Sequence, residues 1–367
     1  MDKELLKFTN EKIKEAQRPE DVFGDLGTGD KLATANLLYR HLSKVVHPNA
    51  YSLGSVEQVI AEEAFKKLSQ LMEDAKARLK DGTYGHIEEA IVRTRRREYK
   101  IFKPIQSTDF CNTYYSTYNE TGIDIPVHFK ISRDPKNNDL VANEARVLRK
   151  LMDGEDYDKY SAYFPSLVDS FTYIDKENPQ PRQANIFSIG NDEFYSLKEV
   201  REVYPDGIDP KDMAWIWRRM LVYLGFTHSN GIIHGAVLPQ NIFIQAEQHG
   251  LIATEWSYAV VDPDTSGEKI SAINNDYESW YPLEVKRKDI PTPALDIYMG
   301  AKCMEYLLPD STDRRLNSFF KGCELERPRQ RPQDAWKLLQ EFDQLIESLW
   351  GPRKFHHFSM PKKAERR

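Results

Sequence analysis

The stretch that decides the fold is Gly231-Ile-Ile-His-Gly-Ala-Val-Leu-Pro-Gln-Asn-Ile-Phe-Ile244. It follows residues 210–230, in which apolar side chains recur at the three- and four-residue spacing of an amphipathic helix. Within the stretch, His234, Pro239 and Asn241 stand at fixed intervals in a mostly apolar run. We therefore expect a long helix that leads directly into a loop, inside a largely helical region.

Length and composition indicate two folded units. A chain of 367 residues is longer than one ordinary small domain, and its 40% hydrophobic and 11% aromatic residues are typical of globular proteins. The 51 basic and 57 acidic residues leave a net charge of −6. This charge argues against wholesale binding of nucleic acid or of an anionic membrane, although local basic clusters could still bind either.

The cysteines and the start of the chain bear on the compartment. Cys111, Cys303 and Cys323 are an odd number without metal-ligand spacing, and the sequence opens with charged residues instead of a signal sequence. No apolar run reaches the ~20 residues that a membrane-spanning helix needs. These features predict a cytoplasmic protein with no membrane partner.

The apolar pattern changes along the chain and sets the expected domain boundaries. Residues 5–79 show only helical spacing, with a break at Pro48, and predict a helical hairpin. After the charge run 93–97 the sequence becomes rich in aromatic and β-branched residues, as strands are. The expected parts are a helical module at 1–90, a basic linker at 91–98, a strand-rich lobe at 99–190, a helical lobe at 191–350 and a mobile basic tail at 351–367.

The loop after the long helix resembles the catalytic loop of the protein kinase family. His234, Pro239 and Asn241 stand at the steps where that family has its histidine, proline and asparagine. Further along, Glu284 resembles the glutamate that ends the activation segment, and Arg331 the arginine that pairs with it. The resemblance implies a bilobal, kinase-like α+β fold for residues 99–350, with the strand-rich part as its N-lobe and the helical part as its C-lobe.

The residues that carry chemistry in this loop have changed. Ala236 stands where active kinases place the aspartate that accepts the proton of the substrate hydroxyl, and a methyl group cannot accept a proton. Gly235 and Leu238 replace the arginine and lysine of the family's loop. We therefore expect no catalytic residue here and predict a pseudokinase, which favours a protein that is not an enzyme.

The resemblance also implies a weakened nucleotide site. Lys130 and Glu144 match the lysine that contacts phosphates and its acidic partner, and Glu255 replaces the metal-binding aspartate. Glu255 and Asn241 both offer the hard oxygen ligands that Mg²⁺ prefers. The phosphate loop, however, corresponds to residues 106–112, which contain no glycine to let backbone amides approach phosphates. Weak binding of ATP and Mg²⁺ by Lys130, Glu144, Asn241 and Glu255 is the expectation.

The N-terminal module resembles the J-domain of co-chaperones. That family carries a histidine-proline-aspartate loop between two helices and stimulates ATP hydrolysis by a heat-shock chaperone; His47 and Pro48 match, while Asn49 replaces the aspartate. The change removes an acceptor of charge-assisted hydrogen bonds, so the resemblance implies a degenerate J-domain. Arg40 and Lys44 on the preceding helix, with the loop, are the expected partner-binding residues, although a solvated helix face is the favoured explanation of the two cations.

Three functions remain open at this stage. The first is a catalytically impaired pseudokinase that acts as a scaffold, adaptor or regulatory subunit for another macromolecule, which we expect to be a protein. The second is an atypical ATP-dependent phosphotransferase or nucleotidyltransferase, and the third is a J-domain co-chaperone with a heat-shock chaperone as partner. The basic segments 93–97 and 353–367 leave nucleic acid open as a partner.

Overall fold

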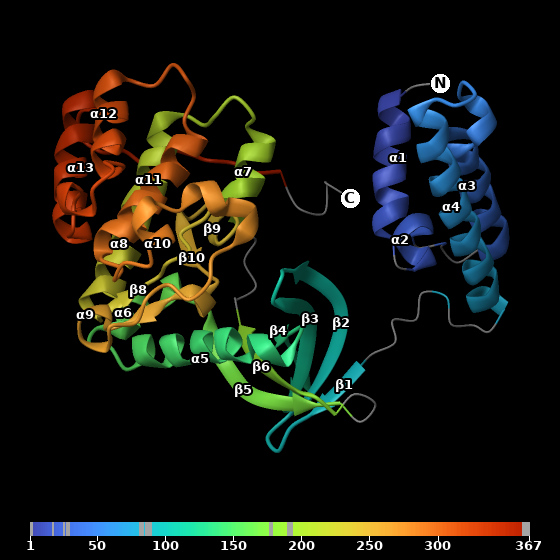
Figure 1. Cartoon of the computed structure of the whole chain (residues 1–367), viewed down its shortest axis with the longest axis horizontal. Coiled ribbons are helices and arrows are strands. Elements are labelled where there is room, and N and C mark those ends of the chain that lie inside the picture. The colour runs from blue at the N-terminus through green and yellow to red at the C-terminus, as the bar shows by residue number, and fades with distance from the viewer. Residues whose placement is uncertain are drawn as a thin grey trace. The chain divides into compact units, whose positions relative to one another are not determined.

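The computed structural model describes residues 3–16, 18–24, 26, 30–80, 84, 90–175, 179–188 and 194–361, without the side chains of residues 3, 4 and 103. The chain forms two compact units, Met1–Glu88 and Glu89–Arg367 (Figure 1). No helix within these described ranges is long and apolar enough to cross a membrane. Each unit is described by itself below.

The first unit is helical and has its own core. Its elements are α1 (Lys3–Glu15), α2 (Pro19–Phe23), α3 (Lys31–Val46), the 3-10 turn η1 (Pro48–Ala50) and α4 (Val56–Lys80). Helix α3 begins where the side chain of Asp30 accepts a hydrogen bond from the backbone N–H of Ala33 at 3.0 Å, and it ends before Pro48. Helices α3 and α4 pack together, and α1 and α2 cover them. The fully buried Ala61 and Leu68 of α4 lie in this core.

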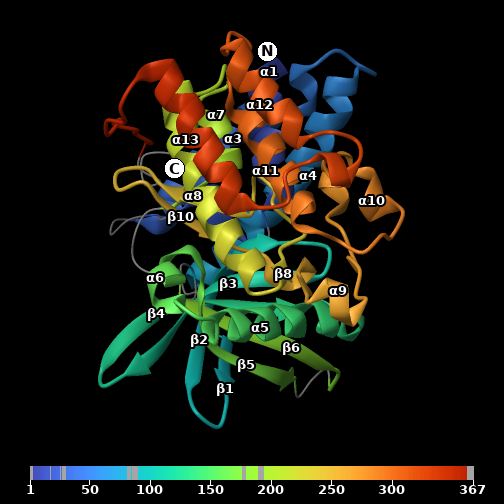
Figure 2. The same cartoon turned by 90° about the vertical axis from the view of Figure 1, so that its left-hand side faces the viewer.

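The second unit begins with a curled antiparallel sheet (Figure 1). Its described strands, in the order β1-β2-β3-β4-β6-β5, are β1 (Ala90–Arg93), β2 (Glu98–Ser107), β3 (Cys111–Glu120), β4 (Ile123–Ser132), β6 (Pro181–Ser188) and β5 (Ser166–Ile174). Helix α5 (Asn138–Met152) follows the short turn η2 (Pro135–Asn137) and lies across β5 and β6 (Figure 2). The aromatic ring of Tyr99 is completely buried in the core of this lobe.

The expected linker at 91–98 is a β-hairpin. Strand β1 pairs with β2 from Ala90, opposite Ile101, to Arg93, opposite Glu98. The hydroxyl of Thr94 accepts hydrogen bonds from the backbone N–H groups of Arg96 and Arg97 and so stabilises the turn. The arginine run is thus the polar turn of a hairpin, which has the same composition as a solvated connection.

The C-lobe is mainly helical. Its elements are α6 (Tyr157–Tyr160), η3 (Ser161–Tyr163), β7 (Tyr195–Ser196), α7 (Leu197–Val203), α8 (Pro210–Ser229), β8 (Ile232–Ile233), β9 (Ile242–Gln245), β10 (Gly250–Ala253), η4 (Trp256–Tyr258), β11 (Val260–Val261), α9 (Pro263–Ser266), η5 (Asn275–Trp280), α10 (Leu283–Lys286), α11 (Pro293–Leu307), α12 (Arg314–Cys323), η6 (Pro328–Gln330) and α13 (Ala335–Trp350). Helix α8 forms the centre and packs against α11 and α13 (Figure 2). Its fully buried Trp217 explains the long apolar pattern of the sequence.

The described part of the expected tail, residues 351–361, is packed against the C-lobe. Phe358 is only 7% exposed and its ring lies 5.6 Å from that of Tyr204. The hydroxyl of Tyr204 donates a hydrogen bond to the carbonyl oxygen of Ser359 at 2.6 Å. Phe358 and the hydrogen bonds of His356, Ser359 and Pro361 thus hold this range against the C-lobe, while residues 362–367 lie outside the described residues.

Candidate functional site: the kinase-like loop and its lysine

The loop after α8 is held by a buried aspartate of α11. The carboxylate of Asp296 accepts hydrogen bonds from the backbone N–H groups of His234 and Gly235, both at 2.8 Å. Nε2 of His234 lies 3.0 Å from the carbonyl oxygen of Thr254, and burial lowers the pKa of this histidine, which keeps it neutral near pH 7. These contacts give His234 a structural role.

Gly235 is required by the backbone at its position. Its φ is 71°, in the left-handed region that favours glycine, and a Cβ atom there would lie 2.6 Å from Cδ1 of Ile270. A side chain of any kind would therefore strain the loop. The arginine that the resemblance places at this step cannot be accommodated in this conformation.

The position of the missing base is apolar and closed. Ala236 is fully buried in a cluster with Phe110, Cys111, Val141 and Tyr258. Such a cluster offers no carboxylate beside the methyl group. The loop therefore lacks, at this position, the group with which an active kinase accepts the proton of a hydroxyl nucleophile.

The structure brings Lys130 and Glu144 together and adds Glu255 to them. Nζ of Lys130 on β4 lies 2.9 Å from Oε2 of Glu144 on α5 and 2.7 Å from Oε1 of Glu255. It also donates a hydrogen bond to the hydroxyl of Ser257 at 3.2 Å. The side chain of Lys130 is 6% exposed and that of Glu144 is 3% exposed, so this is a buried charged cluster.

The charges of this cluster depend on one another. Burial alone lowers the pKa of Lys130, but attraction by Glu144 and Glu255 outweighs it and holds the pKa well above its ordinary value. Burial raises the pKa of Glu144, and the adjacent ammonium group of Lys130 opposes this shift. Lys130 is therefore firmly protonated, and its positive charge opposes the effect of burial on the pKa of Glu144.

The expected magnesium ligands are engaged by the protein itself. The side-chain amide of Asn241 donates a hydrogen bond to the carbonyl oxygen of Ala236 at 3.0 Å, and Glu255 binds the ammonium group of Lys130. Glu255 also adopts a left-handed φ of 68°, which costs a residue with a Cβ atom about 1–2 kcal/mol. A lysine cation 2.7 Å from the carboxylate repels Mg²⁺, so this donor set does not fit a divalent cation in this conformation. No group of three or more histidine, cysteine, aspartate or glutamate residues suited to a metal occurs in the part of the chain that the structure describes.

The segment at the place of the phosphate loop turns an aromatic ring inward. Phe110, between β2 and β3, is 5% exposed, and its ring packs edge-on against Tyr258 with 5.6 Å between centroids. Nζ of Lys130 lies 5.4 Å from the same ring centroid. The side-chain amide of Asn275 donates a hydrogen bond to Asp109 at 3.0 Å and so ties this hairpin tip to the C-lobe.

Phe110 was not predicted from the sequence as a site residue. The available signal was an aromatic residue inside a stretch that should contain glycines. An aromatic side chain at such a place is usually on a strand, so the pattern alone did not show that its ring fills the space beside Lys130. That contact depends on the fold of both lobes.

The architectural pair of the resemblance is also present. Arg331 and Glu284 form a buried ion pair, in which Nη2 lies 3.2 Å from Oε2. The guanidinium group of Arg331 also donates a hydrogen bond to the carbonyl oxygen of Glu326 at 2.9 Å. These bonds fix the segment before α11 independently of any catalytic chemistry.

In the first unit the expected partner-binding residues lie at the surface. Arg40 and Lys44 are exposed on α3, and His47 and Asn49 are exposed in the turn that follows, with Pro48 partly buried. The ring of His47 packs edge-on against Phe65 of α4 at 5.1 Å. The backbone N–H of Asn49 donates a hydrogen bond to Nδ1 of His47 at 3.3 Å, so the turn is ordered by its own residues.

Solved structures identify the fold of the larger unit. The BubR1 kinase domain matches with a TM-score of 0.54 at 13% sequence identity, over 81% of this chain and 95% of that chain. Vaccinia related kinase 3 matches with a TM-score of 0.52 at 14% identity, over 71% of this chain and 91% of that chain. No family model and no curated protein matches the sequence. The chain therefore contains a bilobal protein-kinase-like fold, while the likeness of its N-terminal unit to J-domains stays a prediction.

Proposed function

We propose that this protein is a pseudokinase that serves as a scaffold or regulatory subunit for another protein. The observation that carries the proposal is the closed state of the kinase-like site. Phe110 covers Lys130, and the base position Ala236 lies in the same apolar cluster. A nucleotide and a hydroxyl substrate would both need space that these side chains occupy.

Electrostatics support the same function. One lysine and two carboxylates leave the cluster of Lys130, Glu144 and Glu255 with a formal charge of −1. Kinases depend on positive charge from lysine and metal ions to neutralise the phosphates that they transfer. A buried negative cluster without a fitting metal site repels a polyphosphate, so we propose that ATP and Mg²⁺ bind weakly or not at all at this place.

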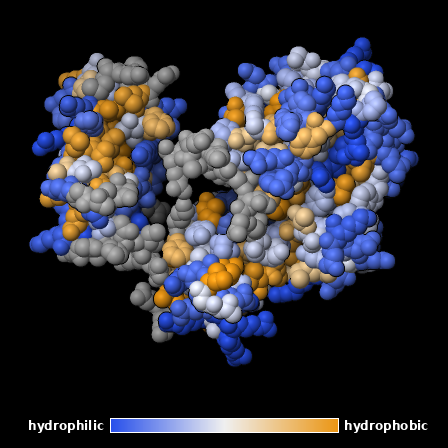
Figure 3. All heavy atoms as spheres, turned by 180° about the vertical axis from the view of Figure 1, so that it is seen from behind, coloured by the Kyte–Doolittle hydropathy of each residue, from blue (hydrophilic) through white to orange (hydrophobic). Residues whose placement is uncertain are grey.

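The first unit is the proposed docking module. Several of its large apolar residues are well exposed, including Phe8 at 69%, Leu53 at 94% and Val56 at 72%, and apolar side chains are visible on the surface of this unit in Figure 3. Exposed apolar side chains and the exposed cations Arg40 and Lys44 on the same small unit suit a protein partner with an acidic rim. A heat-shock chaperone is one such partner, but Asn49 lacks the carboxylate on which stimulation depends in the J-domain family.

The retained ion pair supports a second function, an atypical phosphotransferase or nucleotidyltransferase. Lys130 and Glu144 keep the contact that the family uses to position nucleotide phosphates. For this function Phe110 would have to leave its cluster and Lys130 would have to release Glu255. Both functions can be tested by one labelling experiment.

The test is covalent transfer from ATP. The full chain would be incubated with γ-labelled and, separately, α-labelled ATP with Mg²⁺ or Mn²⁺ and a generic protein substrate. We expect no label on either protein above that of a sample denatured beforehand. Label that appears with the native chain and disappears in Lys130→Ala would overturn the pseudokinase proposal and support the transferase.

The scaffold role needs a separate measurement. The tagged full chain would be used to recover partners from its native cells, beside Arg40→Glu/Lys44→Glu and the control Lys269→Glu in the second unit. We expect to recover the same amount of the same partner with the native chain and with the control. The double variant should recover at least fivefold less of it. Equal recovery with all three proteins would remove the proposed role of α3.

A further inference from the structure

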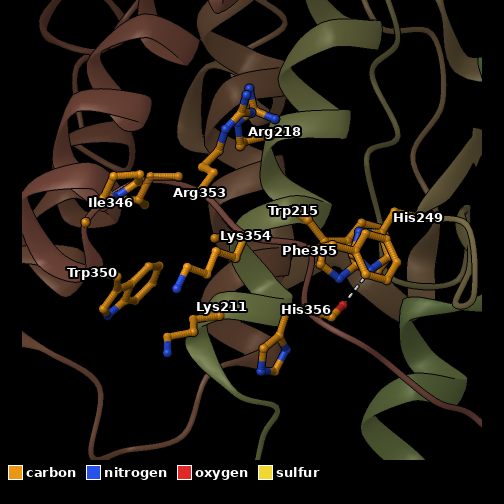
Figure 4. Close-up of a pocket in the computed structure, with 13 residues that line it drawn as sticks. Lys211, Trp215, Arg218, His249, Ile346, Trp350, Arg353, Lys354, Phe355 and His356 are labelled. Carbon is orange, nitrogen blue, oxygen red and sulfur yellow. Dashed lines mark hydrogen bonds between the residues drawn. The ribbon is translucent and has the colours of Figure 1, made fainter.

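A basic hollow lies on the C-lobe, among residues that the kinase-like site does not use. It has a volume of about 680 Å³ and is lined by the first half of α8, the end of α13 and the segment that follows α13 (Figure 4). Ligand pockets for small molecules commonly have volumes of about 300–1,000 Å³. The packing of the C-terminal segment, with Nδ1 of His356 2.6 Å from Oδ1 of Asp212, supplies one wall of the hollow.

The hollow has an excess of free positive charge. Lys211, Arg218, Arg353 and Lys354 line it, and no aspartate or glutamate does. Arg218 is neutralised by Asp343, with Nη2 3.0 Å from Oδ2. Among the contacts of the described residues, none gives an acceptor to the side chains of Lys211, Arg353 and Lys354, all of which are exposed. Three cations around one concave space attract a multiply charged anion.

One wall contains a buried donor without an acceptor. The indole of Trp215 is 9% exposed and stacks on His249 with 4.1 Å between centroids and 2° between planes. Its Nε1 has no hydrogen-bond partner among the described residues. Because this atom has almost no exposed surface, the indole of Trp215 forms part of the wall and is not a contact for a ligand. The other face of His249 is covered by Phe355 at 4.4 Å, which leaves no room for a ligand ring within this stack.

Another aromatic residue, Trp350, lines the hollow and packs with part of its side chain against the C-lobe core. Trp350 at the end of α13 is partly buried and belongs to none of the ring pairs of the described residues. Figure 4 shows the amino groups of Lys211 and Lys354 pointing toward the space beside this indole. Aromatic rings next to cations recur where proteins bind nucleotides, because every base has a face that stacks and every phosphate carries charge.

We propose that this hollow binds a nucleoside phosphate. The base stacks on Trp350, and the phosphates lie among Lys211, Arg353 and Lys354. A bare phosphate has no ring to stack on the indole of Trp350, and neither does a peptide of acidic residues. The site shares no residue with the cluster around Lys130, so it is independent of the pseudokinase proposal.

Binding would be measured by calorimetry with ATP, inorganic triphosphate, adenosine and hexaglutamate as separate probes. We expect ATP to bind at least tenfold more tightly than triphosphate, adenosine or hexaglutamate. Lys354→Glu should weaken ATP binding at least tenfold. The control Lys269→Glu, which changes an exposed lysine outside the hollow, should bind ATP as the native chain does. Trp350→Leu should weaken the binding of ATP and leave the affinity for triphosphate unchanged. Triphosphate or hexaglutamate binding as tightly as ATP, or no ATP binding below millimolar concentration, would overturn the inference.

Photo-crosslinking then locates the ligand. After irradiation with 8-azido-ATP, we expect the labelled peptides to come from residues 346–358. Label on residues 106–132 instead would overturn this inference and would also show that the kinase-like site is open. Absence of label from both regions would contradict the basic hollow alone and leave the pseudokinase proposal intact.

Discussion

Lys130 holds together two buried carboxylates that would otherwise repel each other. Lys130→Met leaves Glu144 and Glu255 without their counter-ion, and loss of one partner from a buried ion pair costs about 3–5 kcal/mol. We expect the free energy of unfolding, measured with urea, to fall by this amount. The same lysine would be free to bind phosphates in an active site, so its stabilising role here is a consequence of the closed cluster.

A combined variant separates charge from packing. Lys130→Met together with Glu144→Gln and Glu255→Gln removes all three charges and keeps similar side-chain volumes. We expect it to regain at least half of the stability that Lys130→Met loses. A combined variant no more stable than Lys130→Met alone would mean that the loss of stability comes from packing. It would not then come from the two buried carboxylates left without a counter-ion.

Glu324 gives the folded state a pH dependence of its own. Burial, reinforced by the nearby Glu305, raises the pKa of Glu324 from 4.5 to about 7. The folded protein then binds more protons than the unfolded chain between these pH values, so stability falls as the pH rises through this window. Because one pKa unit corresponds to about 1.4 kcal/mol, we expect this window to change the free energy of unfolding by roughly 3 kcal/mol. Urea unfolding of Glu324→Gln from pH 4.5 to 7 should lack this component, and an unchanged pH profile would contradict the shifted pKa.

At the scale of elements, the C-terminal segment acts as a structural strap of the C-lobe. Phe358 inserts between Tyr204 and Trp215, with centroid distances of 5.6 Å and 6.2 Å. Burial of a phenylalanine side chain contributes about 1.5–3 kcal/mol, so Phe358→Ala should lower the free energy of unfolding by that range. In limited proteolysis, the segment that follows Gly351 should also be cleaved faster in Phe358→Ala than in the native chain. His357→Ala, at the exposed neighbour, is the control and should change neither result.

Elements differed in how far the sequence could predict them. The loop from His234 to Asn241 was predictable because its spacing follows directly on a long apolar helix, and both signals are local. The positions of Phe110 and Phe358 were not, because their partners Tyr258 and Trp215 are distant in sequence. The sequence does not distinguish a single aromatic residue in a polar run that is exposed from one that is buried and holds its segment in place. Periodicity therefore predicted the helices and strands, but not which loops close over the site.

At the scale of the whole molecule, several contacts that hold each unit together do not involve the side chain of Ala236 or that of Asn49, the positions at which the two sequence resemblances place an acid. Asp296 and the Glu284–Arg331 pair hold backbone segments of the kinase-like unit, and neither depends on Ala236. In the first unit, His47 packs on Phe65 regardless of the side chain of Asn49. The contacts that fold each unit are thus separable from the groups that would catalyse or stimulate a reaction, which supports the proposed non-catalytic function.

The separate cores of the two units predict two unfolding transitions. Leu68 is fully buried in the core of Met1–Glu88, and Leu338 is 2% exposed in the core of the C-lobe. Truncation of a buried leucine to alanine costs about 2–5 kcal/mol, so each variant should destabilise its own unit. In scanning calorimetry of the full chain, we expect Leu68→Ala to lower one transition and Leu338→Ala to lower the other. A single transition that both variants lower equally would show that the units unfold together, because only coupled unfolding carries a local loss to the whole chain.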